Sequence, residues 1–333
     1  MDVIHRCAQD LLALIITPAA REQRGLIGTL VGLLRAEDGT AALAAEALGL
    51  HVCFAGAERT AVGNAVQEAG GIASMVELLR AGSGSEAAAN AAGALWNLVL
   101  SNQSNQDAVR EAGGIAPLLR AGGESEAAAK AAGALLNLAK RNQSNQDAVR
   151  EAGGIAPLVE LLRAGGESEV AAKAVGALWS LASNNPTNKD AIREAGGIAP
   201  LVELLRVGGG SDVAAQAARA LWSLVISNQS NQDAIREAGG IAPLVELLRA
   251  GGESEAAARA ARALMTLAAS NQSNQDAIRE AGGIAPLVEL LRAGGGSEAA
   301  AKAAGALMSL ASNNPTNKDA IREADGIAPL VEL

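Results

Sequence analysis

The sequence has very few aromatic residues. Tyr is absent, and one Phe and three Trp bring the aromatic share to 1% of the 333 residues. A hydrophobic core must therefore be built from Ala, Leu, Ile and Val. These small or unbranched side chains let helices approach closely and favour helix over strand. The chain is predicted to be all-α.

Cysteine and histidine are also scarce, with two of each. Two Cys are too few for a disulfide framework and are compatible with a reducing compartment. The pairs His5–Cys7 and His51–Cys53 resemble zinc ligands, but on a helix residues i and i+2 point about 200° apart, and structural zinc needs four convergent ligands. We therefore predict no metal, no cofactor and no catalytic residue, and hence no enzyme.

Long apolar runs and an excess of basic residues are both missing. The run Leu11–Ala20 follows Asp10 and is far shorter than the roughly 18 residues of a membrane span, so residues 1–25 are predicted to form an N-terminal capping helix. A formal net charge of −9 argues against nucleic-acid binding. We expect no nucleic-acid partner, no membrane insertion, and a cytoplasmic location with the nucleus as a second compartment.

What the sequence does have is repetition. The stretch REAGGIAPLVELLR occurs four times, at 150–163, 193–206, 236–249 and 279–292, always 43 residues apart. A variant, QEAGGIASMVELLR, stands at 67–80, and a contracted form, REAGGIAPLLR, at 110–120. A unit of this size cannot bury its apolar faces alone, so copies are predicted to stack, each completing the core of its neighbour.

Each period predicts three helices, as residues 143–183 illustrate. Ser144, followed by Asp147, has the form of a capping box that opens a short first helix. Two Gly end it, Pro157 falls in the first turn of a second helix that runs to about Arg163, and Ser168 caps a third helix. The third helix has one broad apolar arc, predicted to be core: Val170, Ala171, Ala174, Val175, Ala177, Leu178, Leu181, Ala182.

Three helices in 42–43 residues, with a recurring Gly-Gly, a Pro in the second helix and NKDAIREAGGIAPLVELLR at 188–206, resemble the armadillo repeat. The resemblance implies a right-handed α-solenoid over residues 26–333. It would comprise a partial repeat at 26–56, six full repeats at about 57–312, and a truncated one at 313–333. Residues 183–191 return at 312–320, so block duplication or deliberate consensus construction are both open.

The resemblance also implies a concave groove, lined by the third helices, that binds an extended peptide. In that family a Trp and an Asn four residues apart often hold the ligand backbone. The Trp-equivalent positions here are Gly93, Gly133, Gly176, Arg219, Arg262 and Gly305. The Asn-equivalent positions are Asn97, Asn137, Ser180, Ser223, Thr266 and Ser309. This departure makes the chain less similar to nuclear-import adaptors than to plant-type and adaptor armadillo arrays.

Basic residues stand one turn earlier in several repeats and, with Arg219 and Arg262, predict a positive stripe along the groove. The predicted ligand is an extended, acidic or phosphorylated peptide. The plain alternative is a solvated helix face neutralised by i, i+4 pairs such as Glu169 with Lys173. The predicted peptide-binding residues are Trp96, Asn97, Lys130, Asn137, Lys173, Trp179, Ser180, Arg219, Trp222, Ser223, Arg259, Arg262, Thr266, Lys302 and Ser309.

Two features of the sequence each have two possible interpretations. The three Trp lie between the core arc and the groove arc, where packing between repeats competes with ligand contact. The contraction at 115–120 removes about one helical turn, which indicates either a tolerated deletion or a hinge.

The predicted function is a non-enzymatic protein-interaction scaffold. One competing interpretation is a structural repeat array or fragment that associates with itself through its last repeat, where Ile327, Leu330 and Val331 lack a following unit. The other is an engineered consensus repeat protein.

Overall fold

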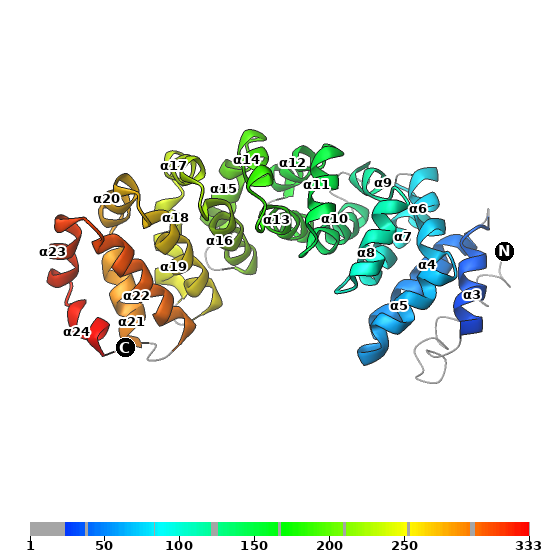
Figure 1. The fold of residues 1–333 in the computed structure, drawn as a ribbon, viewed down its shortest axis with the longest axis horizontal. Coiled ribbons are helices and arrows are strands. Elements are labelled where there is room, and N and C mark those ends of the chain that lie inside the picture. Colours follow the sequence, from blue (N-terminus) through cyan, green and yellow to red (C-terminus); the bar gives the residue numbers. More distant parts are fainter. Residues whose placement is uncertain are drawn as a thin grey trace. The chain divides into compact units, whose positions relative to one another are not determined.

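The described parts of the computed structural model consist of helices joined by turns, with no strand among them. The structure describes residues 24–36, 39–82, 84–120, 126–165, 168–208, 211–251, 254–293 and 297–332. The predicted capping helix at 1–25 therefore lies almost wholly outside the described residues, as do His5 and Cys7. Figure 1 shows helices that recur in the same order along the chain.

The helices fall into three sets that follow one another in each repeat. The first helices are α5 (Arg59–Glu68), α8 (Gln103–Glu111), α11 (Gln143–Glu151), α14 (Pro186–Glu194), α17 (Gln229–Glu237), α20 (Gln272–Glu280) and α23 (Pro315–Glu323). The second helices are α3 (Arg24–Leu33), α6 (Gly71–Ala81), α9 (Ile115–Arg120), α12 (Ile155–Gly165), α15 (Ile198–Gly208), α18 (Ile241–Gly251), α21 (Ile284–Ala293) and α24 (Ile327–Val331). The third helices are α4 (Thr40–Phe54), α7 (Glu86–Leu98), α10 (Glu126–Ala139), α13 (Glu169–Ala182), α16 (Asp212–Val225), α19 (Glu255–Ala268) and α22 (Glu298–Ala311), and a short 3₁₀ helix, η1 (Gly56–Glu58), precedes α5.

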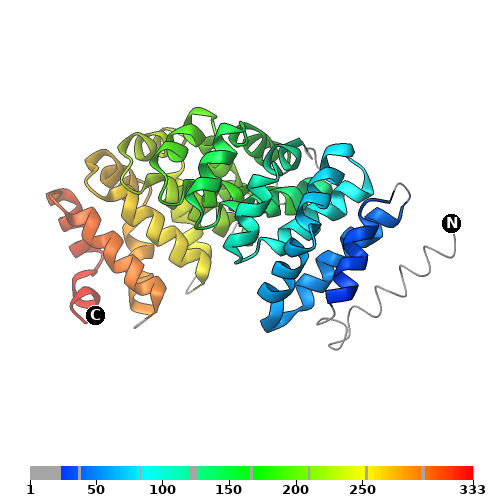
Figure 2. The same cartoon turned by 45° about the vertical axis from the view of Figure 1, so that its right-hand side comes forward.

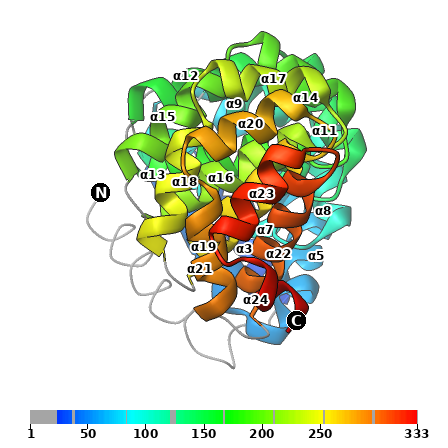
Figure 3. The same ribbon diagram turned by 90° about the vertical axis from the view of Figure 1, so that its left-hand side faces the viewer.

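The chain divides into two compact units, residues 1–161 and 162–333. In the first unit α4 packs on α7 and α7 on α10; in the second, α13, α16, α19 and α22 pack in sequence (Figure 2). The first helices α17, α20 and α23 likewise lie side by side (Figure 3). Within each unit the contacts therefore join equivalent helices of successive repeats.

The first helices begin at an Asn, so the predicted cap at Ser144 is wrong. Helix α11 starts at Gln143, and the side chain of Asn142 accepts a hydrogen bond from the backbone N–H of Asn145 at 3.1 Å. Asn142 has extended backbone angles, and Arg141 before it takes a positive φ of 57°. Asn and Ser are equally good caps, and the turn geometry decides between them. The same cap occurs at Asn102, Asn185, Asn228, Asn271 and Asn314.

The Gly-Gly pair serves two separate needs, as Gly239 and Gly240 illustrate. Gly239 takes a φ of 70° in a Schellman motif in which the N–H of Gly240 donates to the carbonyl of Ile235 at 2.9 Å. A Cβ on Gly240 would lie 2.8 Å from Cγ2 of Ile235, so no larger residue fits without movement. The guanidinium of Arg206, one repeat earlier, donates to the carbonyl of Ala238 at 3.3 Å. The turn thus also ties neighbouring repeats together.

The third helices form the core, as predicted. Ser168 caps α13 by accepting from the N–H of Ala171 at 3.2 Å, and every residue of the predicted apolar arc is buried. The small side chains allow close approach: a Cβ on Gly49 of α4 would lie 3.0 Å from Cα of Ala94 on α7. Within each unit, a third helix therefore covers the apolar face of the next one, so that stacking buries surface that a single repeat would leave exposed.

Buried amides also join the repeats at the start of the first helices. In the second unit Asn231 is fully buried, and its side-chain amide donates to the carbonyls of Leu224 at 3.0 Å and Lys189 at 3.3 Å. Asn271 donates to the carboxylate of Asp233 in the preceding repeat at 3.1 Å. Because a buried polar group that loses its partner is costly, this network favours one register between repeats.

The contracted second helix α9 spans six residues, against eleven in α12. A pocket of about 290 Å³ with a mainly apolar lining lies beside it, bordered by Leu118, Leu119, Leu135 and Leu158. Whether the contraction acts as a hinge stays a prediction.

Two remaining predictions concern metals and membranes. His51 on α4 is fully buried and Cys53 is partly buried, and the described ranges hold no group of three or more His, Cys, Asp or Glu residues arranged to bind a metal. Over the same ranges no single helix is long and apolar enough to cross a membrane. One pair of segments, Thr40–Phe54 and Gly56–Glu68, is long and apolar enough when taken together, but the chain bends by 109° between them.

Candidate functional site

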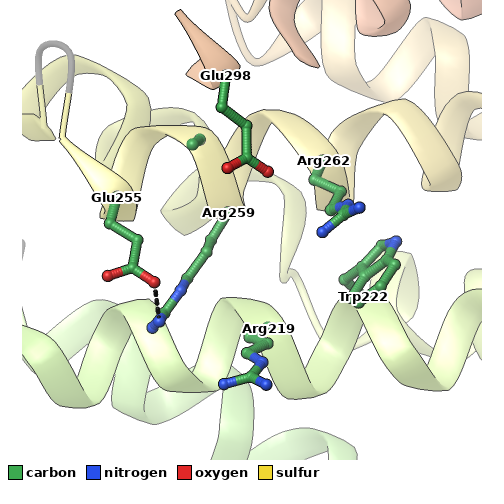
Figure 4. A pocket seen from close by; sticks show the side chains of 7 residues that line it. Arg219, Trp222, Glu255, Arg259, Arg262 and Glu298 are labelled. Atoms are coloured by element: carbon green, nitrogen blue, oxygen red, sulfur yellow. Dashed lines mark hydrogen bonds and ion pairs between the residues drawn. The ribbon is translucent and has the colours of Figure 1, made fainter. Parts of the chain in front are cut away.

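A basic pocket lies on the third helices of the second unit. It has a volume of about 280 Å³ and is formed by α16, α19 and the first turn of α22. The lining residues are Arg219, Trp222, Glu255, Ala258, Arg259, Arg262 and Glu298. Figure 4 shows Arg219 and Trp222 entering from α16, Arg259 and Arg262 from α19, and Glu298 from α22.

Two of the pocket arginines are held on tryptophan rings. The guanidinium carbon of Arg219 lies 3.3 Å from the ring centroid of Trp179, and that of Arg262 lies 4.2 Å from the ring centroid of Trp222. In each pair the Trp belongs to one repeat and the Arg to the next. A guanidinium over an aromatic face is stabilised by the ring quadrupole, and its N–H donors stay in the plane away from the ring.

Other repeats have Gly at the position of Arg219 and Arg262. In two of them the Trp or Met side chain of the preceding repeat packs against the backbone of that Gly. In the first unit a Cβ on Gly133 would lie 2.9 Å from Cδ2 of Trp96. In the second unit a Cβ on Gly305 would lie 2.6 Å from Sδ of Met265. All three Trp are therefore half-buried between repeats, as the packing interpretation expects, and Trp222 also lines the pocket.

Most of the other basic residues on this face have an acidic partner on their own helix. Lys130 pairs with Glu126 at 2.8 Å, Lys173 pairs with Glu169 at 3.7 Å, and Arg259 pairs with Glu255. These are the i, i+4 pairs of the plain alternative, and at exposed carboxylates they contribute little to stability.

Arg219 and Arg262 differ from these residues. Among the described residues neither guanidinium has a carboxylate within 4.0 Å or a hydrogen bond to a protein acceptor. Burial lowers the pKa of Arg219, and the positive charge of Arg259 lowers it further, while Glu255 opposes the effect and Arg262 adds to it. Arg219 thus lies close enough to Arg259 and Arg262 to be repelled by both, and two carboxylates only partly balance the charge of the three groups.

Comparison with known proteins gives the family. The armadillo/β-catenin-like repeat model matches residues 142–183 and 184–226. A crystal structure of an engineered protein is similar over 98% of this chain and 90% of its own, with 30% sequence identity and a TM-score of 0.80. The chain belongs to the armadillo-repeat family.

Two further solved structures are similar to this armadillo-repeat chain. A designed armadillo repeat protein in complex with the peptide (KR)4 has 28% identity and a TM-score of 0.63, covering 72% of this chain and 99% of its own. Another similar structure is described as showing a phosphorylation switch in the interaction between cadherin and β-catenin. It has 19% identity and a TM-score of 0.75, and the match covers 93% of this chain and 57% of its own. At this identity the similarity shows only a shared fold. No curated protein sequence matches the chain. The fold is an armadillo α-solenoid, and the molecule is an armadillo-repeat scaffold.

The two Asn at the Asn-equivalent positions of this armadillo array form hydrogen bonds within the protein. The side-chain amide of Asn97 donates to the carbonyl of Gly49 at 3.1 Å, and that of Asn137 donates to the carbonyl of Trp96 at 3.2 Å. Asn137 is 3% exposed. Both amides therefore bridge consecutive third helices, and the peptide-contact prediction for them stays untested.

The short hydroxyl residues at the same positions differ from one another in burial. Ser180 and Ser223 are only 1% and 3% exposed, so neither presents a surface to a ligand. Thr266 is half-buried and its hydroxyl donates to the carbonyl of Arg262 at 3.0 Å. Ser309 and Lys302 on α22 are half-buried, and Lys302 stays a predicted site residue outside the basic pocket.

Two acidic residues of the pocket are absent from the predicted site. Glu255 could have been found, because it stands four residues before Arg259 on one helix and such pairs meet. Glu298 stands 43 residues after Glu255, in the next repeat, and only the stacking of α22 on α19 brings it to the pocket.

Proposed function

We propose that the chain is a non-enzymatic scaffold that binds an extended, acidic or phosphorylated peptide along its third helices. The observation that carries the proposal is the pair Arg219 and Arg262. They stand in adjacent repeats, each is held on a Trp ring, and neither has an ion-pair partner in the described part of the chain. Uncompensated guanidinium groups in a half-enclosed pocket attract anions.

The charge on this face supports an acidic ligand rather than a basic one. The designed armadillo repeat protein named above is in complex with (KR)4, a peptide of basic residues only. In this chain the third-helix pocket contains three Arg and two Glu, so a basic peptide would meet like charge. We therefore propose that the armadillo groove is used here with the opposite preference.

Fluorescence anisotropy with labelled peptides tests the proposal on the full chain. Oligoglutamate should bind, oligolysine of equal length should not, and salt should weaken the binding because the contacts are charged. Arg219→Gln with Arg262→Gln should reduce the oligoglutamate affinity about tenfold, equivalent to roughly 1.4 kcal/mol.

The matched control is Arg236→Gln. Arg236 lies on the first helix α17 and pairs with Glu237, away from the pocket, so it should leave the affinity unchanged. Equal binding of the two peptides, or an equal effect of the control, would contradict the proposal.

A second candidate function is self-association through the last repeat. Ile327 is 51% exposed and Val331 is 81% exposed, and both are large apolar side chains. An exposed apolar patch favours association. Light scattering over a dilution series should then show a mass that falls on dilution, and Val331→Glu should leave only monomer; a constant monomer mass in the unaltered chain would exclude this function.

The alternative that the chain is an engineered consensus repeat protein concerns its origin and does not change the proposed binding site. The near-identical repeats support it, as does the similarity to an engineered protein. A consensus array should unfold at high temperature, above about 90 °C. A cytoplasmic and nuclear location also stays a proposal, to be checked by imaging a fluorescent fusion in cells.

A further inference from the structure

The basic pocket is a departure from an otherwise repeated sequence. Repeats that are nearly identical elsewhere carry Gly at this third-helix position, at 93, 133, 176 and 305, and only two adjacent repeats carry Arg. Packing does not require the change, because Trp96 packs on Gly133 without an Arg. The difference is confined to one place, where it gathers three guanidinium groups.

We infer that the pocket of Arg219, Arg259 and Arg262 binds a phosphomonoester group carried by the peptide, as phosphoserine or phosphothreonine. The inference rests on the proposed function and names the chemistry of one ligand residue. It assigns the phosphate to Arg219 and Arg262 first, with Arg259 as a third donor that Glu255 already engages.

Donor geometry favours phosphate over carboxylate. The Trp rings lie against the guanidinium groups of Arg219 and Arg262, which reduces the side-chain ordering that their N–H donors need when a ligand arrives. A carboxylate has two oxygens and engages one guanidinium bidentately, whereas a phosphomonoester has three acceptor oxygens and can join donors from two repeats. A pocket of about 280 Å³ has room for this group.

Charge favours the same ligand. The positive charges of Arg259 and Arg262 both disfavour the protonated form of Arg219, which raises the energy of the empty pocket. A phosphomonoester brings a charge of about −1.5 to −2 at neutral pH and relieves this repulsion, while a carboxylate brings only one charge.

The two carboxylates of the pocket oppose the binding of an anion. Glu255 holds Arg259, and Glu298 faces the same space from the next repeat (Figure 4). Both carboxylates repel any anionic ligand and Glu255 competes for Arg259, so the attraction depends on Arg219 and Arg262, which pair with neither carboxylate. Glu298→Gln should therefore strengthen phosphate binding by about threefold, since removing a nearby like charge is worth a few tenths of a kcal/mol to roughly 1 kcal/mol.

The test uses the full chain, immobilised, and three libraries of short random peptides with a fixed central residue. The central residue is phosphoserine, glutamate or serine, and total retained peptide is measured. We expect about tenfold more retention of the phosphoserine library than of the glutamate library, because the extra charge and oxygen are worth roughly 1.4 kcal/mol. Inorganic phosphate and phenyl phosphate should both compete, and the peptide should bind more tightly than either.

The decisive variant is Arg219→Gly with Arg262→Gly. It restores the residue found in sister repeats, so folding should persist, and circular dichroism checks this. It should remove the preference for phosphoserine, whereas Arg236→Gln, which changes a charge on the first helix α17 away from the pocket, should keep it. Arg219→Lys with Arg262→Lys keeps the charge but loses the planar fork, and should retain only part of the preference.

Four results would overturn the inference. Equal retention of phosphoserine and glutamate libraries, with both lost in the Gly variant, rejects phosphate selectivity but supports the proposed function. A phosphoserine preference that survives in the Gly variant rejects this pocket. Retention of no acidic library rejects the proposed function itself. Tighter binding of a single-stranded oligonucleotide than of any phosphopeptide assigns the pocket to phosphodiesters instead.

Discussion

Trp96 and Trp222 occupy the same place in two repeats but lie against different partners. The ring of Trp96 lies against the backbone at Gly133, and the ring of Trp222 carries the guanidinium of Arg262. The first arrangement buries the apolar surface of the ring against the next third helix. The second uses the same buried ring as a platform that holds a charge at the surface. One packing position thus has two uses, and the identity of a single residue in the next repeat selects between them.

Removing the rings should have the largest effect and should separate the two uses. Trp96→Ala and Trp222→Ala should each cost about 2 kcal/mol of stability, because each removes a half-buried aromatic side chain. Only Trp222→Ala should also weaken oligoglutamate binding, by about tenfold, because Arg262 loses its platform. Thermal unfolding and anisotropy measure the two quantities, and an equal loss of binding in both variants would show that the comparison is wrong.

Filling the space under Trp96 should have an intermediate effect. Gly133→Ala normally favours a helix by about 1 kcal/mol, but its Cβ would meet the Trp96 ring at 2.9 Å, and overpacking costs roughly 1–3 kcal/mol. We expect a net loss of about 1 kcal/mol.

The matched control is Gly28→Ala on α3, where a Cβ would meet nothing within 4 Å. This variant should gain stability by about 0.5–1 kcal/mol. If Gly133→Ala also stabilises the protein in thermal unfolding, the ring is free to move, and Gly is not required there.

A smaller effect on stability is expected at Lys189, which lies outside the candidate site at a position where the repeats differ. Lys189 replaces the Gln of four other repeats, is 6% exposed, and donates from Nζ to the carbonyl of Ile226 at 2.7 Å. Burial lowers the pKa of Lys189, with Asp190 opposing, so the folded chain holds this proton less tightly than the unfolded chain. Stability therefore rises with pH between the lowered pKa and the ordinary value of 10.5.

Lys189→Gln should consequently stabilise the protein at pH 7 by about 0.5 kcal/mol, and the gain should shrink as the pH approaches 10.5. Gln106 and Gln232 show that a Gln amide reaches the same kind of carbonyl acceptor. Lys318→Gln changes the equivalent residue where the Lys is exposed, and it should have no effect. Urea unfolding at several pH values measures the difference, and a gain that grows with pH would reverse the assigned sign.

The helical layout could be predicted because the signals are local. Ser168 caps α13 as expected, Pro157 lies in the first turn of α12, and the apolar arc of α13 is buried. The error at Ser144 arose because Asn142, two residues earlier, is an equally good cap. Only the left-handed turn at Arg141 decides which of them begins the helix.

The candidate site was harder to predict because it depends on neighbours. An angular position on one helix placed Ser180 and Ser223 beside Lys173 and Arg219, yet both Ser are buried. The helical period does not show how closely the next third helix approaches, and small residues allow a very close approach. The same limit left Glu298 outside the predicted site.

By itself the sequence determined the all-α class, the period, the armadillo resemblance and the apolar face of each helix, because helix propensity, caps and a 3.6-residue period act within a few residues. The tertiary structure alone decided which side chains reach the surface, which Trp carries a guanidinium, and which cations keep an acidic partner. These properties depend on distances between repeats about 40 residues apart, and such distances are set when the third helices pack.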